Sequence, residues 1–110
     1  MRAVAAARAP PATQIIRPIQ VESVQVLVDG TQVSAHVTGV IGDGCTELAG
    51  VTITREDASV SITIRSARPA EAICTQVARL YDETLRIPGE FARGRYRLSV
   101  NSVETTFDVP

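Results

Sequence analysis

The sequence is 110 residues long, with 11 basic and 12 acidic side chains and a formal net charge of −1. This length suits one domain with a single core, and the near-neutral charge gives no long-range attraction for nucleic acid or an anionic membrane. Hydrophobic residues make up 45% of the chain, which argues against disorder, and no apolar run approaches the ~18 residues that cross a bilayer. Every basic residue is an arginine, which we attribute to a GC-rich genome rather than to a binding function.

Residues 1–18 differ in composition from the rest of the chain. They contain three arginines, three prolines and no acidic residue. The apolar stretch 4–7 is too short for the hydrophobic region of a secretory signal, and Arg8 interrupts it. We therefore expect 1–18 to be a flexible lead-in, either a linker or an internal start within a longer precursor. The folded domain should span 19–110.

Strand patterns with a period of two dominate from residue 19 onward. Val24, Val26 and Val28 alternate with polar residues and lead into Asp29-Gly30, a strong hairpin signal. The remaining segments in which apolar residues alternate with polar ones are 31–41, 51–55, 60–65, 78–87, 95–100 and 103–109. These seven short strands, with turn signals at regular spacing, predict a β-sandwich or a small barrel.

Two turns stand out among the connections. Pro69 permits one helical turn at 69–72, and we expect no longer helix there. Asn101-Ser102 is a plausible tight turn between the last two strands, although Asn-Gly would be a stronger signal.

The run 91–100 resembles the L-x-x-G-x-Y-x-L-x-V signature of immunoglobulin-like sandwiches, in which a tyrosine, here Tyr96, bonds back to the preceding backbone. Together with the segments 44–47 and 68–74, it resembles small bacterial extracytoplasmic domains of lipoproteins and secreted proteins with no assigned role. The resemblance covers about residues 20–109. It implies an all-β, immunoglobulin-like sandwich of about seven antiparallel strands.

Cys45 and Cys74 are the only cysteines, and each lies beside a predicted turn rather than in a strand centre. A disulfide between them would close a loop of about 30 residues and stabilise the fold by roughly 3.5 kcal/mol in the chain-entropy model. The alternatives are two reduced thiols or a metal or redox pair, the last without a C-x-x-C motif or a second ligand cluster. We favour the disulfide, which implies a secreted, periplasmic or cell-surface protein.

A disulfide would hold the loops 42–46 and 67–75 together, so these loops form the candidate binding edge. The candidate contact residues on them are Asp43, Glu47, Arg68 and Glu71. If these loops bind a partner, substitution of Glu47 or Arg68 should weaken that binding and leave thermal stability unchanged, whereas a purely structural module would show no partner.

A second candidate surface is a basic face formed by Arg93, Arg95 and Arg97, which Arg86 would join from a neighbouring strand. It would suit an anionic polymer or partner. The alternative, which we favour, is a solvated outer face paired with Glu104 and Asp108 across the final hairpin. Because aromatic residues are few and most are expected in the core, we predict no nucleic-acid partner.

Groups suited to catalysis are sparse. His36 is the single histidine and shares a strand face with Ser34 and Thr38, opposite the apolar residues. The sequence contains no G-x-S-x-G motif, clustered metal ligands, calcium loop or phosphate-binding glycine loop, so we predict no catalytic residue, metal or cofactor. The sequence thus predicts a non-enzymatic, extracytoplasmic structural or protein-interaction module. The alternative is a loop-mediated ligand-binding or protease-inhibitor module.

Overall fold

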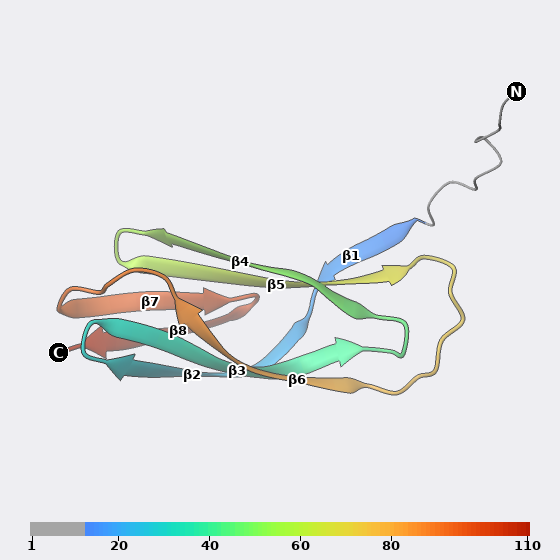
Figure 1. The fold of residues 1–110 in the computed structure, drawn as a ribbon, viewed down its shortest axis with the longest axis horizontal. Helices are drawn as coiled ribbons and strands as arrows, with labels where there is room; N and C mark the ends of the chain where they lie inside the picture. Colours follow the sequence, from blue (N-terminus) through green and yellow to red (C-terminus); the bar gives the residue numbers. More distant parts are fainter. Residues whose placement is uncertain (1–12) are drawn as a thin grey trace, which may run out of the picture.

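A computed structural model describes residues 13–110, which form two β-sheets and no helix (Figure 1). The strands in chain order are β1 (Gln14–Pro18), β2 (Gln20–Asp29), β3 (Gln32–Gly42), β4 (Glu47–Glu56), β5 (Ser59–Pro69), β6 (Arg79–Ile87), β7 (Gly94–Val100) and β8 (Val103–Val109). Strands β1, β4, β5, β7 and β8 form a five-stranded sheet, and β2, β3 and β6 form a three-stranded sheet. The predicted β-sandwich is confirmed.

The alternating pattern decides which side chains enter the core. Along β3, Val33, Ala35 and Val37 are fully buried, while the polar residues between them lie on the outer face. Strand β5 repeats the arrangement with its own alternating apolar residues, which face the core from the other sheet. Gly30 has a φ of 63°, which a glycine adopts without strain, and it allows the tight turn between β2 and β3.

An aromatic cluster closes one part of the core. The Phe91 ring lies edge-on to the rings of Tyr96 and Phe107, with centroids 5.0 and 5.8 Å away. The hydroxyl of Tyr96 donates a hydrogen bond to the backbone oxygen of Ala92 at 2.7 Å. This bond is the one implied by the resemblance of 91–100 to immunoglobulin-like sandwiches.

The strand count and one pairing differ from the expected seven antiparallel strands. Residues 13–110 form eight strands, and β5 pairs with β7 in parallel, with Ser59–Ile62 aligned to Arg97–Val100. Strand β4 lies along the other edge of β5. A parallel pair joins segments that are distant in sequence, so no hairpin signal marks it.

The additional strand is β1, which lies inside the span 1–18 that we expected to be a flexible lead-in. Its five residues pair antiparallel with Arg65–Pro69 of β5. Only Ile15 in this strand is even partly buried, so β1 has no alternating pattern, and it is ordered by backbone pairing with a distant segment. Residues 1–12 of the expected lead-in lie outside the described part of the chain.

Candidate functional site

The loops that join β3 to β4 and β5 to β6 meet at one end of the sandwich, on the right in Figure 1. The predicted disulfide joins them: Cys45 and Cys74 are bonded, with their Cα atoms 5.6 Å apart. The backbone N–H of Gly44 also donates to the backbone oxygen of Thr75 at 2.9 Å. We call residues 42–46 and 67–75, linked in this way, the disulfide edge.

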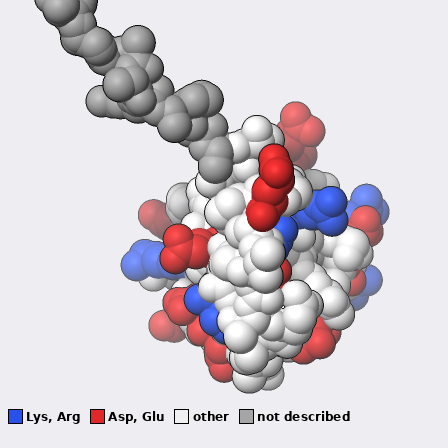
Figure 2. All heavy atoms as spheres, turned by 90° about the vertical axis from the view of Figure 1, so that its right-hand side faces the viewer, with Lys and Arg blue, Asp and Glu red and all other residues white. Residues whose placement is uncertain are grey.

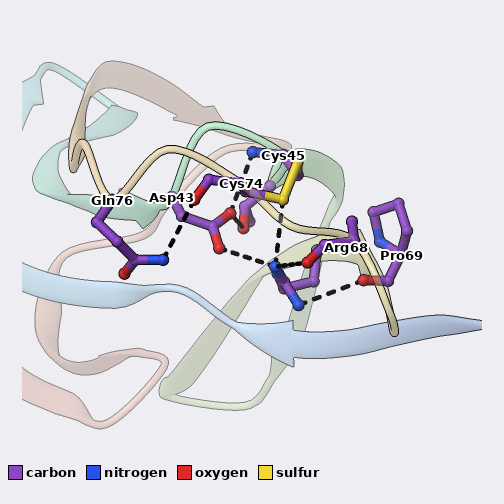
Figure 3. Close-up of polar contacts among 8 residues, drawn as sticks. Asp43, Cys45, Arg68, Pro69, Cys74 and Gln76 are labelled. Atoms are coloured by element: carbon purple, nitrogen blue, oxygen red, sulfur yellow. Dashed lines mark hydrogen bonds and ion pairs between the residues drawn. A yellow bond between two sulfur atoms is a disulfide. The ribbon is translucent and has the colours of Figure 1, made fainter.

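Asp43 organises the first of these loops (Figure 3). Its Oδ1 atom accepts hydrogen bonds from the Thr46 hydroxyl at 2.8 Å and from the Cys45 backbone N–H at 3.1 Å. Its Oδ2 atom lies 3.0 Å from an Arg68 guanidinium nitrogen. The Thr46 hydroxyl, followed by the Cys45 N–H and the Arg68 guanidinium, lowers the pKa of Asp43 below its ordinary value, although burial opposes the shift.

Arg68 joins the second loop to the first. Besides contacting Asp43, its guanidinium donates to the backbone oxygens of Pro69 and Ala72 and to the Sγ atom of Cys74, each at 3.3 Å. Its side chain is 26% exposed. These contacts give Asp43 and Arg68 a positioning role at this edge, and their contact with a partner stays a prediction. Substitution of Arg68 should therefore lower stability, in contrast to our expectation from the sequence.

The other two predicted contact residues are open to solvent. Glu47, at the start of β4, and Glu71, in the turn after β5, are both exposed. The segment 69–72 forms a hydrogen-bonded turn, in which the Ala72 N–H donates to the Pro69 oxygen at 3.4 Å. The structure thus brings all four candidate residues to this end of the molecule, where the two glutamates are the more exposed.

Three exposed apolar side chains were missed by sequence reasoning. Ile73 is fully exposed, and Val77 and Leu80 are 60% and 79% exposed. All three lie in or just after the loop that contains Cys74. One sign of this exposure is present in the sequence, which is that apolar residues occur in the stretch 66–77 although it lacks strand alternation. Viewed from this end, much of the surface is uncharged, and most charged side chains lie toward its margins (Figure 2).

A groove of about 330 Å³ lies beside Arg68 and Thr46, which form part of its lining. Apolar residues of β1, of the junction between β1 and β2, and of β3 contribute to its walls, among them Ile15, Ile19 and Ile41. Thr46, Ser66 and Arg68 supply polar groups. The Nε atom of Arg68 is buried and has no hydrogen-bond partner in the described part of the chain.

The residues of the candidate basic face are all exposed: Arg95 and Arg97 lie on β7, and Arg93 lies just before it. Arg95 forms an ion pair with Asp108 across the final hairpin, with Nε and Oδ1 2.9 Å apart. The hydrogen bond and charge of each partner raise the pKa of Arg95 and lower that of Asp108. Glu104, however, lies opposite Ser99 rather than opposite an arginine. Arg86 belongs to β6 in the other sheet, so our expectation that it joins this face from a neighbouring strand is wrong.

His36 lies on the outer face of β3, as expected from its strand pattern. Its Nε2 atom is 2.6 Å from Oδ1 of Asp82 on the neighbouring strand β6, and both side chains are partly exposed. Within residues 13–110, no three His, Cys, Asp or Glu side chains lie together as metal ligands would. In the same residues, no helix has the length and apolar character to cross a membrane.

The fold and this edge define a two-sheet β-sandwich whose β3–β4 and β5–β6 loops are joined by a disulfide. The chain belongs to the ORF11 beta-sandwich domain family, whose sequence model matches residues 35–109. The matched region includes both cysteines.

Two relatives come from Herpetosiphon aurantiacus. The uncharacterized 10.2 kDa protein in the HgiCIIM 5′ region is 30% identical over 88 residues, which cover 77% of this chain and 94% of the relative. The uncharacterized 10.2 kDa protein in the HgiBIM 5′ region is 29% identical over 72 residues, covering 66% and 88% of the two chains. No solved structure gives a significant match.

Proposed function

We propose that this chain is a non-enzymatic, extracytoplasmic protein-interaction module that binds its partner through the disulfide edge. The observation that carries the proposal is the fully exposed Ile73 beside the bonded Cys74. Val77 and Leu80, which follow it in the chain, are exposed as well, and exposed apolar surface is a feature of protein-binding sites. A loop already restrained by a covalent bond also loses less conformational entropy when it binds.

Two observations support the compartment and the fold subtype. A disulfide persists in oxidising environments and is rare in the cytosol, which favours a secreted, periplasmic or lipoprotein-type location. The hydrogen bond from Tyr96 to Ala92 supports the immunoglobulin-like assignment. In such sandwiches, loops gathered at one end commonly serve as the binding surface.

Site-specific photocrosslinking in the cells that make the full chain tests this proposal. A photoreactive amino acid replaces Ile73 in one variant and Gln25 in a matched control, since Gln25 is exposed on β2 of the three-stranded sheet. We expect a discrete adduct with another protein from position 73 and none from position 25. Combined replacement of Cys45 and Cys74 by serine should reduce the adduct. Equal labelling from both positions, or no adduct from position 73, would contradict the proposal.

The groove beside Arg68 favours a second candidate function, the binding of a small amphipathic anion. Its apolar walls suit a short hydrocarbon chain, and the positively charged Arg68 in its lining suits a carboxylate. Titration with a medium-chain fatty acid, followed by NMR, should shift the amide signals of Ile15 and Ile41. Unchanged signals at saturating fatty acid would exclude this candidate.

A further inference from the structure

Strand β4 is a free edge of the five-stranded sheet. It pairs with β5 along one side and with no other strand in the described part of the chain (Figure 1). Its charged residues occur only at its two ends, so the stretch 48–54 is uncharged. A free edge presents unpaired backbone N–H and C=O groups, which pair readily with another extended chain.

The other edge strands carry features that oppose such pairing. β6 has four charged residues in nine, and β8 has two in seven. β2 is irregular between Val21 and Ser23, where it also carries Glu22. β1 is only five residues long and ends in Arg17-Pro18. Charges, prolines, bulges and short length all discourage edge-to-edge contact, so β4 is the least protected edge.

The core-facing side of β4 is apolar and only partly covered. Val51 lies opposite Ile64 of β5, and Ile53 lies opposite Ile62, both of which are buried. Val51 nevertheless remains 41% exposed, and Leu48 on the same side is 46% exposed. These side chains would lose contact with water if another strand were added beside β4.

We propose that β4 pairs antiparallel with β4 of a second copy of this chain, around a two-fold axis at Val51. The two Val51 side chains then lie opposite each other, and each Leu48 lies opposite Ile53 of the other copy. Ala49 has no partner residue in this register, just as it has none in the pairing of β4 with β5. Both exposed apolar residues of the strand gain an apolar partner in this arrangement.

Charge and symmetry favour a second copy over an unrelated strand. In this register Thr54 lies opposite Glu47, and no two like charges face each other within the paired stretch. The net charge of −1 gives little repulsion between copies. The contact is self-complementary, as a two-fold dimer requires. Because β4 starts at the disulfide edge, the antiparallel dimer would carry its two disulfide edges at opposite ends.

Sedimentation equilibrium of the full chain provides the first test. We expect a reversible dimer, and Val51→Lys should weaken it by at least ~10-fold because two like charges would face each other. The matched control is Leu27→Lys, since Leu27 is 47% exposed on the edge strand β2. It should leave the dimer unchanged. A strictly monomeric wild-type protein, or equal effects of the two lysines, would overturn the proposal.

Crosslinking tests the register and does not depend on the folding of the lysine variant. Val51→Cys places two thiols directly across the axis, where opposite Cβ atoms lie about 5 Å apart. Under mild oxidation we expect a dimer joined through position 51, identified by peptide mass spectrometry. Thr54→Cys is the control, because its exposed side chain would face Glu47 rather than Thr54 of the other copy. Equal crosslinking of both variants would refute the register.

Discussion

The side chain of Asn101 completes the backbone hydrogen bonding of Ile64. Its Oδ1 atom accepts from the Ile64 N–H at 2.9 Å, and its Nδ2 atom donates to the Ile64 oxygen at 3.1 Å. Nδ2 also donates to the Ile19 oxygen at 2.8 Å. Along this edge of β5 the neighbour changes from β7 to β1, and the asparagine amide bridges the gap between them.

We predict that Asn101→Ala lowers the free energy of unfolding by about 2–4 kcal/mol. The variant loses three hydrogen bonds at partly buried groups and places an alanine at a φ of 53°. Asn101→Gly should cost roughly 1 kcal/mol less, because glycine adopts that φ without strain. Urea unfolding measures both values, with Ser102→Ala as the control. Equal stability of Asn101→Ala and wild type would contradict the bridging role.

A second prediction concerns the hydroxyl of Tyr96. Tyr96→Phe removes only the bond to the Ala92 oxygen and leaves the ring against Phe91 and Phe107. We expect a loss of about 1 kcal/mol in the free energy of unfolding and an unchanged core. Urea unfolding together with the aromatic NMR spectrum checks this. If the variant were as stable as wild type, the back-bond would have no role in holding the corner.

Acid should weaken the disulfide edge through Asp43. The folded state lowers the pKa of this carboxyl below 3.8, chiefly through the Thr46 hydroxyl. The ionised form therefore stabilises the fold above that pH, and the contribution is lost as the pH falls through the folded-state pKa. Wild type should be more stable than Asp43→Asn near neutrality, and the difference should shrink below about pH 4. Urea unfolding of both proteins from neutral pH to below pH 4 measures the difference in their free energies of unfolding.

Glu71→Gln serves as the control for this pH series, because Glu71 is exposed. The free energies of unfolding of Glu71→Gln and wild type should differ little at every pH of the series. A constant difference between wild type and Asp43→Asn at every pH would show that ionisation of Asp43 is not what stabilises the loop.

Removal of the disulfide should be costly. The bond joins residues 29 apart in sequence, and the chain-entropy model gives roughly 3.5 kcal/mol for a loop of this size. We expect the double variant Cys45→Ser, Cys74→Ser to lose about 3 kcal/mol in urea unfolding. Wild type measured in reductant should match the variant. A loss below about 1 kcal/mol would show that the other contacts of the edge suffice without the bond.

Most of the sandwich could be predicted from sequence because its strands bury one face. Val33, Ala35 and Val37 alternate with polar residues, and such a pattern fixes which side enters the core. β1 could not be predicted in this way, since nearly all of its side chains are exposed. The parallel pairing of β5 with β7 also left no local signal, because it depends on how distant segments meet.

The meeting of the two loops was predicted from the sequence, whereas the contacts of Asp43 and Arg68 within them were not. The cysteine pair indicated which loops meet, and the disulfide confirms that they do. The role of Arg68 depends on the path of its loop, which brings Ala72 and Cys74 back toward the guanidinium. No spacing rule encodes that path. Arg86 was misplaced for a related reason, since strand neighbours along the sequence need not share a sheet.

The state of the two thiols in living cells tests the account most directly. Cells that make the full chain are treated with a membrane-permeable alkylating agent before lysis, and the protein is then digested without reductant and examined by mass spectrometry. We predict a single crosslinked species that joins the Cys45 and Cys74 peptides, with neither cysteine alkylated. Recovery of both peptides separately, each fully alkylated, would contradict the oxidised edge, the extracytoplasmic location and the binding surface proposed on it.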